Sequence, residues 1–184
     1  MKKIISLLGA CFFAFNCLSA QTSRNCKVLI STKFNDSLYT VVSKEATLTF
    51  NLATNDLTLK LKLKSLDHEI DTIENFFNQY QPSDDLIYLA NTSINVFDLI
   101  ESEANRNKIY PLSGNLTLNS ISKGVEGTYS LLKLTNESQD TKLNLRFSLD
   151  LSFNPIDFGI NKIFPLLNQK VYIEIDEAIV NIIE

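Results

Sequence analysis

Residues 110–131 read YPLSGNLTLNSISKGVEGTYSL, and this stretch gives the clearest indication of the fold. It predicts two short strands, Leu112–Asn119 and Val125–Leu131, joined by a polar turn at Ser120–Gly124. None of its side chains is a reactive group in a catalytic pattern. The stretch therefore predicts a fold rather than an activity.

Apolar and polar residues alternate along three further segments. Ala46–Leu52 places four apolar side chains on one face, and Leu57–Leu63 does the same, with Thr58, Lys60, Lys62 and the following Lys64 opposite. In Leu143–Phe153, six apolar side chains alternate with polar ones. A period of two predicts antiparallel strands with one buried face. Ala53–Asp56 is the predicted hairpin connection between the segments Ala46–Leu52 and Leu57–Leu63.

The last predicted strand changes phase. The first three apolar residues have odd numbers, Val171, Ile173 and Ile175, and the next three have even numbers, Ala178, Val180 and Ile182. In a regular strand the two sets would lie on opposite faces. One extra residue near Asp176-Glu177 would return all six side chains to the same face, which is what a β-bulge does. A plain strand break would give the same pattern. A bulge would bend the strand, as the curvature of a barrel requires.

Two segments do not fit the strand pattern. Between residues 70 and 80, apolar residues recur at helical spacing, which predicts a helix laid against the open end of a barrel. Residues 84–103 are ambiguous, and we interpret them as a second short helix followed by a strand. Asn154–Asn168 is expected to be a connection with a helical turn. The helical positions in the first segment are Ile70, Ile73, Phe76, Phe77 and Tyr80.

The N-terminus resembles an export signal. Lys2 and Lys3 precede an apolar run, Ile4–Phe15, and small residues at Leu18–Ala20 precede Gln21. This pattern predicts a signal peptide over residues 1–20 and one domain over residues 21–184. The apolar run is shorter than the roughly 20 residues that a membrane span needs. We expect no transmembrane span, and we expect a periplasmic or secreted protein.

A lipoprotein is the alternative, because Leu8–Cys11 resembles a lipobox. A cleaved signal is favoured, since lipidation of Cys11 would leave Phe12–Phe15 exposed in the mature protein. Cleavage after residue 20 leaves 15 basic and 21 acidic side chains, a net charge of −6. An acidic protein is a poor match for nucleic acid or anionic lipid. We expect no nucleic-acid partner.

The sequence gives little sign of catalysis. Cys26 is the only cysteine after the predicted signal peptide, so no internal disulfide is expected, and a lone cysteine is more often a small buried hydrophobe than a reactive thiol. The single histidine, His68, lies in the acidic run Asp67–Asp71, which we interpret as a solvated turn or helix start rather than a metal site. No serine lies in a nucleophile elbow. We expect no enzyme, no metal and no cofactor.

Residues 110–131, the opening stretch, resemble the YceI-like proteins, and the resemblance is expected mainly in the C-terminal half of the chain. Its departures are Ser120, where the family usually has glycine, and Ser122, where threonine is usual. Because Ser120 replaces a glycine, a turn that needs positive φ would be strained there. The positions that match the family pattern are Gly114, Leu116, Thr117, Leu118, Ile121 and Lys123.

This resemblance implies a mainly β fold, an antiparallel lipocalin-like β-barrel with one or two short helices. It also implies an exported protein that holds a long apolar molecule, such as a polyisoprenoid. An eight-stranded barrel either is filled by its own side chains or holds one small ligand, and a lipid tail can bind there without a fixed polar anchor. The expected lining residues are Leu48, Phe50, Leu59, Leu61, Leu145, Phe147, Leu149 and Ile173.

The resemblance implies one function, and the strand pattern leaves a second one open. The first is a barrel that binds an apolar, lipid-like ligand of the isoprenoid type in its interior. The second is a secreted structural or interaction module with a solid core, because the same alternation would also pack a core without a ligand. The sequence leaves open whether the protein is a homodimer.

Overall fold

The computed structural model describes seven stretches of the chain, residues 21–34, 37–51, 54–67, 85–92, 108–134, 143–160 and 169–182. Strands dominate them. Two 3₁₀ turns accompany the strands, η1 (Leu63–Ser65) and η3 (Pro155–Phe158). The strands are β1 (Gln21–Phe34), β2 (Ser37–Asn51), β3 (Asp56–Leu61), β4 (Leu66–Asp67), β5 (Leu86–Asn91), β6 (Tyr110–Leu118), β7 (Ile121–Leu134), β8 (Leu143–Phe153) and β9 (Val171–Ile182).

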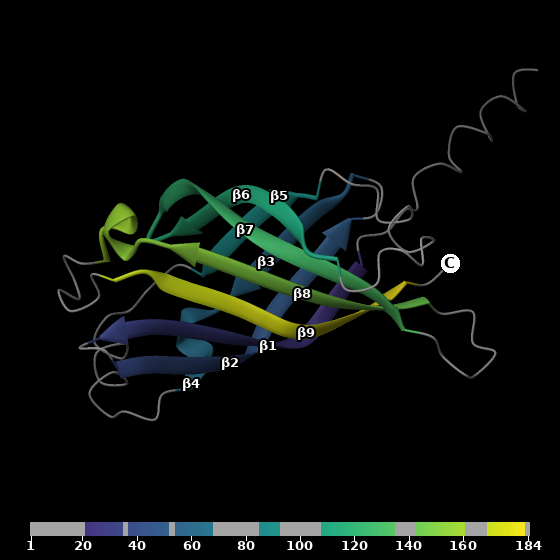
Figure 1. The fold of residues 1–184 in the computed structure, drawn as a ribbon, viewed down its shortest axis with the longest axis horizontal. Helices are drawn as coiled ribbons and strands as arrows, with labels where there is room; N and C mark the ends of the chain where they lie inside the picture. The colour runs from purple at the N-terminus through teal and green to yellow at the C-terminus, as the bar shows by residue number, and fades with distance from the viewer. Residues whose placement is uncertain are drawn as a thin grey trace, which may run out of the picture.

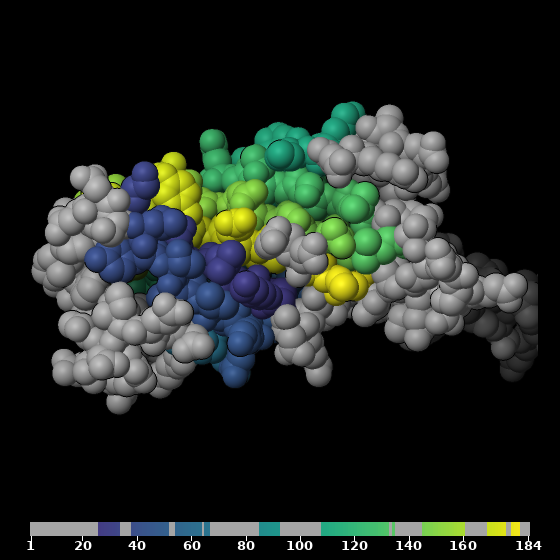
Figure 2. Space-filling model, turned by 60° about the horizontal axis from the view of Figure 1, so that its bottom comes forward, coloured from purple at the N-terminus to yellow at the C-terminus, as the bar shows by residue number. Residues whose placement is uncertain are grey.

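The strands close into an antiparallel barrel. Neighbours follow the order β1-β9-β8-β7-β6-β5-β3-β2, and β1 pairs with β2 to complete the ring, while the two-residue β4 pairs with β2 alone. Figure 1 shows the tilted strands wrapped around a common interior. On the face seen in Figure 2, β1 (purple) lies between β2 (blue) and β9 (yellow). The predicted antiparallel barrel is confirmed, and the helix predicted over residues 70–80 lies outside the described residues.

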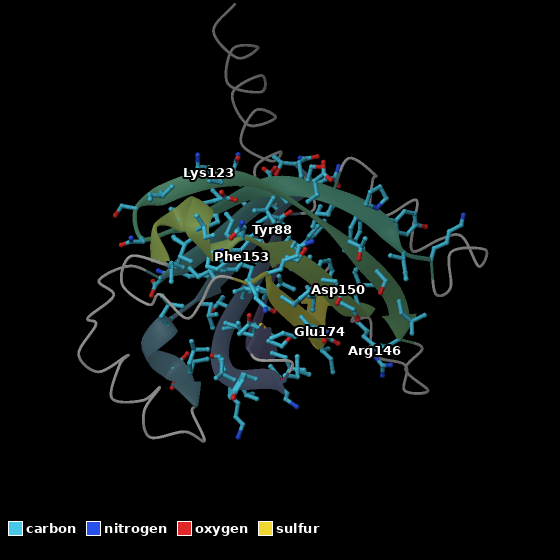
Figure 3. The ribbon with its side chains drawn as sticks, turned by 60° about the vertical axis from the view of Figure 1, so that its left-hand side comes forward. Tyr88, Lys123, Arg146, Asp150, Phe153 and Glu174 are labelled. Atoms are coloured by element: carbon cyan, nitrogen blue, oxygen red, sulfur yellow. The ribbon has the colours of Figure 1, made fainter. Side chains whose placement is uncertain are left out.

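The alternation sorts side chains between the interior and the surface. In β3, Leu57, Leu59 and Leu61 are fully buried, and their neighbour Lys60 is exposed and forms an ion pair with Asp85 at 2.8 Å. In Figure 3, Tyr88 and Phe153 lie inside the ring of strands, whereas Lys123 points outward. The predicted Leu57–Leu63 strand is too long, because the chain leaves the sheet after Leu61 and turns through η1.

The phase change in β9 is a bulge. Phe147 of β8 pairs with Ala178, and Leu149 pairs with Ile175, so two residues of β9 face the single residue Ser148. Val171 and Ile173 on one side of this bulge, like Ala178 and Val180 on the other, are buried. The extra residue therefore keeps both halves of β9 facing the interior, and a simple strand break is excluded.

Residues 84–103 were wrongly predicted to begin with a helix, since strand β5 occupies Leu86–Asn91. Leu86, Tyr88 and Ala90 are buried, so the strand alternates like the others. The pattern is hidden in the sequence because the outward-facing Ile87 and Leu89 are also apolar. Residues 93–107, which the same prediction covered, lie outside the described part of the chain.

The predicted turn at Ser120–Gly124 is too long. Leu118 pairs with Ile121, which leaves a two-residue turn, Asn119-Ser120, with φ of 53° and 58°. Positive φ at both central residues is typical of a type I′ turn, whose twist matches that of the flanking strands. Ser122, Lys123 and Gly124 belong to β7 and are exposed there. Their polarity therefore reflects an exposed strand end, not a loop.

Replacing Ser120 with glycine is expected to stabilise the protein by about 0.5–1 kcal/mol, because glycine adopts positive φ without the steric cost that serine incurs. Urea denaturation of the two proteins, monitored by circular dichroism, measures the difference. The matched control is Ser113→Gly in β6, where the backbone is extended and exposed. The free energy of unfolding of that variant should fall by about as much as Ser120→Gly raises it, since glycine weakens a strand interior. A lower stability of both variants would contradict the backbone strain inferred at Ser120.

Candidate functional site: the barrel interior

The apolar side chains of the strands converge in the barrel interior. All eight predicted lining residues point into it, and each is between 0% and 4% exposed. They come from β2, β3, β8 and β9, which are brought together when β1 closes the ring. The prediction that these residues share one buried face is confirmed. Their contact with a ligand stays a prediction.

Aromatic side chains form a row along one part of the interior. The rings of Tyr110 and Tyr129 are 5.5 Å apart between centroids, and those of Tyr129 and Phe147 are 6.0 Å apart and nearly parallel. The row thus crosses β6, β7 and β8. Towards the η3 end, Phe153 and Phe158 meet edge to face at 5.2 Å. Of these five residues, only Phe147 was predicted from the sequence to be a lining residue.

Two tyrosines cross the inner side of β6 in opposite directions. Tyr88 extends from β5, and its hydroxyl donates to the Val125 carbonyl oxygen of β7 at 3.3 Å. Tyr129 extends from β7, and its hydroxyl donates to the Thr92 carbonyl oxygen, just after β5, at 3.2 Å. The first hydrogen bond joins β5 to β7, which are not neighbours in the sheet, and the second joins β7 to the residue that follows β5. The pair therefore connects β5 and β7 beneath β6.

Gly114 gives Tyr88 the room to cross. A Cβ atom at residue 114 would contact the Leu89 carbonyl oxygen and would lie 2.7 Å from Tyr88 Cζ. No real Cβ atom tolerates such a separation, so the strand accepts only glycine there without a shift. The glycine of the opening stretch is thus needed for close packing within the interior.

Burial keeps the ionisable interior groups neutral. Desolvation raises the pKa of Tyr88 to about 12, and it also raises the pKa of Tyr129. Both hydroxyls therefore stay protonated at neutral pH. Apart from the tyrosines and Cys26, the fully buried polar side chains of the described residues are Ser43 and Thr92, and neither carries a charge.

Cys26 is buried at the β1–β2 interface, as predicted, and its thiol donates to the Ala46 carbonyl oxygen at 3.3 Å. Burial raises the pKa of the Cys26 thiol to about 11. The reactive thiolate is therefore only about one part in a thousand at pH 8.

We expect the folded mature protein, in which Cys26 would be the only cysteine, to resist thiol labelling at pH 8. Because the thiol is both shielded and protonated, reaction with a chromogenic disulfide reagent should become rapid only after unfolding in guanidinium chloride. Rapid reaction of the folded protein would show that this part of the barrel opens readily.

The other candidates for chemistry were His68 and a metal site. His68 lies outside the described residues, so its role as part of a solvated turn stays a prediction. No group of three or more metal-ligating side chains is found among the described residues. Within the same residues, no helix is long and apolar enough to cross a membrane.

The fold and its interior thus define a lipocalin-like antiparallel barrel with an apolar inside. No protein-family model and no curated protein matches the sequence. Solved structures do match. A polyisoprenoid-binding domain from Saccharophagus degradans, described as implicated in plant cell wall breakdown, superposes with a TM-score of 0.67 at 11% identity over 89% of this chain and 98% of that one.

Two further barrels are similar. The YceI protein of Campylobacter jejuni matches with a TM-score of 0.54 at 19% identity, over 76% of this chain and 81% of its own. BcnA of Burkholderia cenocepacia matches with a TM-score of 0.52 at 13% identity, over 89% and 96%. The predicted resemblance to YceI-like proteins is thereby confirmed at the level of the fold, and it extends over most of the chain.

Proposed function

We propose that this chain is an exported binding protein whose barrel interior holds an apolar, lipid-like ligand of the isoprenoid type. The likeness to a domain described as polyisoprenoid-binding, across nearly the whole of that domain, is the observation that carries this proposal. The apolar interior supports it, because each buried CH₂ of a lipid tail contributes roughly 0.8 kcal/mol. In this role the protein binds rather than catalyses, and it acts in the periplasm or outside the cell.

The ligand is best sought in the protein from its native host. The mature protein is purified, extracted with organic solvent and analysed by mass spectrometry, and a lipid at about one molecule per chain is expected. A second exported protein, purified with the same tag from the same cells, controls for lipid carried over by the procedure. If the extract holds only what the control holds, and the emptied barrel takes up no added lipid, the proposal fails.

A solid-core module is the second candidate, and the burial of the interior favours it. Leu48, Leu59 and Leu149 are fully buried, so their side chains already pack against other parts of the chain. A ligand would have to move such side chains apart. As an interaction module the protein would use outer apolar residues such as Leu38 and Ile179, which are 64% and 51% exposed. The extraction experiment separates the two candidates, because a solid core carries no lipid.

A further inference from the structure

One end of the barrel interior is polar. Tyr110 begins β6, at the opposite end of that strand from the Asn119-Ser120 turn, and its ring packs against that of Tyr129. Beyond the Tyr129–Thr92 hydrogen bond, the Thr92 backbone N–H and Oγ1 both donate to the Asn55 carbonyl oxygen, at 3.0 and 3.3 Å. A continuous chain of contacts therefore joins Asn55, Thr92, Tyr129 and Tyr110 where β5 ends and β6 begins, and we call these four residues the polar end.

Two atoms of the polar end are buried without a partner. Neither the Tyr110 hydroxyl nor Asn55 Oδ1 has a hydrogen-bond partner among the described residues, although both atoms are shielded from solvent. Burying a polar group without a hydrogen bond is costly, so folded proteins satisfy nearly all such groups. One of these atoms is a donor and the other an acceptor. A ligand group that satisfied both atoms would have to accept from the first and donate to the second.

Charge at the polar end is restricted to the surface. The ionisable side chains next to it in sequence, Asp56 and Lys108, are exposed. The Asp56 carboxylate accepts a hydrogen bond from Asn91 Nδ2 at 2.9 Å. Side-chain hydrogen bonds from Thr54 and from Asn91 lower the pKa of Asp56. An ionic headgroup brought inside would lose its hydration without meeting a buried counter-charge. The polar end therefore suits an uncharged group.

The polar end also leads directly into the apolar interior. The Tyr129 ring stacks on Phe147 of β8, and Phe147 lies on the same buried face as Leu145 and Leu149. A molecule with a polar head at Tyr110 would thus have its tail among the predicted lining residues.

We propose that the polar end binds the uncharged headgroup of the ligand, a primary amide or an alcohol, which accepts a hydrogen bond from the Tyr110 hydroxyl and donates one to Asn55 Oδ1. This inference rests on the proposed function. It assigns a polar headgroup to a ligand for which the fold indicates only an apolar tail. Tyr110 and Asn55 then become binding residues, and neither was predicted from the sequence to be one.

The test compares three probes of equal chain length, hexadecane, hexadecanamide and hexadecanoate. Each displaces an environment-sensitive fluorescent dye from delipidated mature protein. The wild type should bind the amide more tightly than the alkane or the carboxylate. Tyr110→Phe should weaken amide binding about 5- to 10-fold, the usual value of one hydrogen bond, and leave alkane binding unchanged.

Two more variants test the hydrogen-bond acceptor and provide a control. Asn55→Gly removes the acceptor while keeping the backbone, because φ of 58° at residue 55 suits glycine, and it should weaken amide binding to a similar extent. Tyr172→Phe removes a hydroxyl from a side chain that is 47% exposed on the outer face, and it should change nothing.

Thermal unfolding gives an independent readout. Without ligand, Tyr110→Phe should melt no lower than the wild type, because the hydroxyl that it removes has no partner to lose. A clearly lower melting temperature would show that the hydroxyl is already satisfied within the protein, which would overturn the inference.

The possible failures are distinguishable. Equal binding of alkane and amide, tightest binding of the carboxylate, or equal weakening of alkane and amide by Tyr110→Phe would overturn the headgroup site alone. Failure of all three probes to displace the dye, together with an extract free of lipid, would overturn the proposed function itself.

Discussion

Phe147→Ala should lower the free energy of unfolding by about 3–5 kcal/mol, the usual cost of removing a fully buried phenylalanine. Phe147 is 1% exposed and stacks on Tyr129, so the truncation removes both buried area and a ring contact. Urea denaturation of the delipidated protein measures the loss. Tyr172→Ala is the control, because it removes an aromatic ring from the outer face and should cost less than about 1 kcal/mol.

The same variant also bears on ligand binding. Truncation at residue 147 leaves an apolar space, and such spaces bind small apolar molecules. Added hexadecane should therefore raise the melting temperature of Phe147→Ala, because a ligand that binds only the folded state stabilises it. If Phe147→Ala without ligand lowered the free energy of unfolding by less than about 1 kcal/mol, the Phe147 side chain would not be tightly packed in the interior.

Gly114→Ala should cost about 3 kcal/mol, the upper part of the range for overpacked positions. The added methyl group would meet the Leu89 carbonyl oxygen, which belongs to the backbone of β5, and the Tyr88 ring. The strand has to move away or Tyr88 has to give up its hydrogen bond to Val125. Both responses would disturb the two tyrosine hydrogen bonds that connect β5 and β7 beneath β6.

Gly124→Ala is the matched control for Gly114→Ala. A Cβ atom at residue 124 would have nothing within 4 Å, and alanine is favoured over glycine in an extended strand. This variant should be neutral or slightly stabilising in the same denaturation experiment. Equal losses in the two variants would show that β6 and β7 depend on backbone flexibility rather than on space at residue 114.

Much of the barrel could be predicted from local pattern. Leu143–Phe153 was predicted to be a strand with the bounds that the structure gives to β8, and the bulge near Asp176-Glu177 was predicted from a change of parity. Such predictions succeed because alternate side chains of a strand face opposite sides of the sheet. The buried face of each strand can therefore be read from a few consecutive residues.

The candidate site was predicted only in part. The eight lining residues are buried as expected, since they belong to strands with clear alternation. Tyr88 was missed because apolar residues on both faces of β5 hide its alternation. Tyr110 and Tyr129 lie in the opening stretch, but nothing in that stretch distinguishes a core tyrosine from one that holds a ligand.

By itself the sequence determined the strands, their buried faces and the bulge, because these depend on neighbours within a few residues. Only the tertiary structure decided how the barrel closes, why residue 114 must be glycine, and where the polar end lies. The two tyrosine hydrogen bonds beneath β6 each join residues 37 positions apart. Such contacts exist only after the strands have paired in their final order, and no local pattern of residues encodes them.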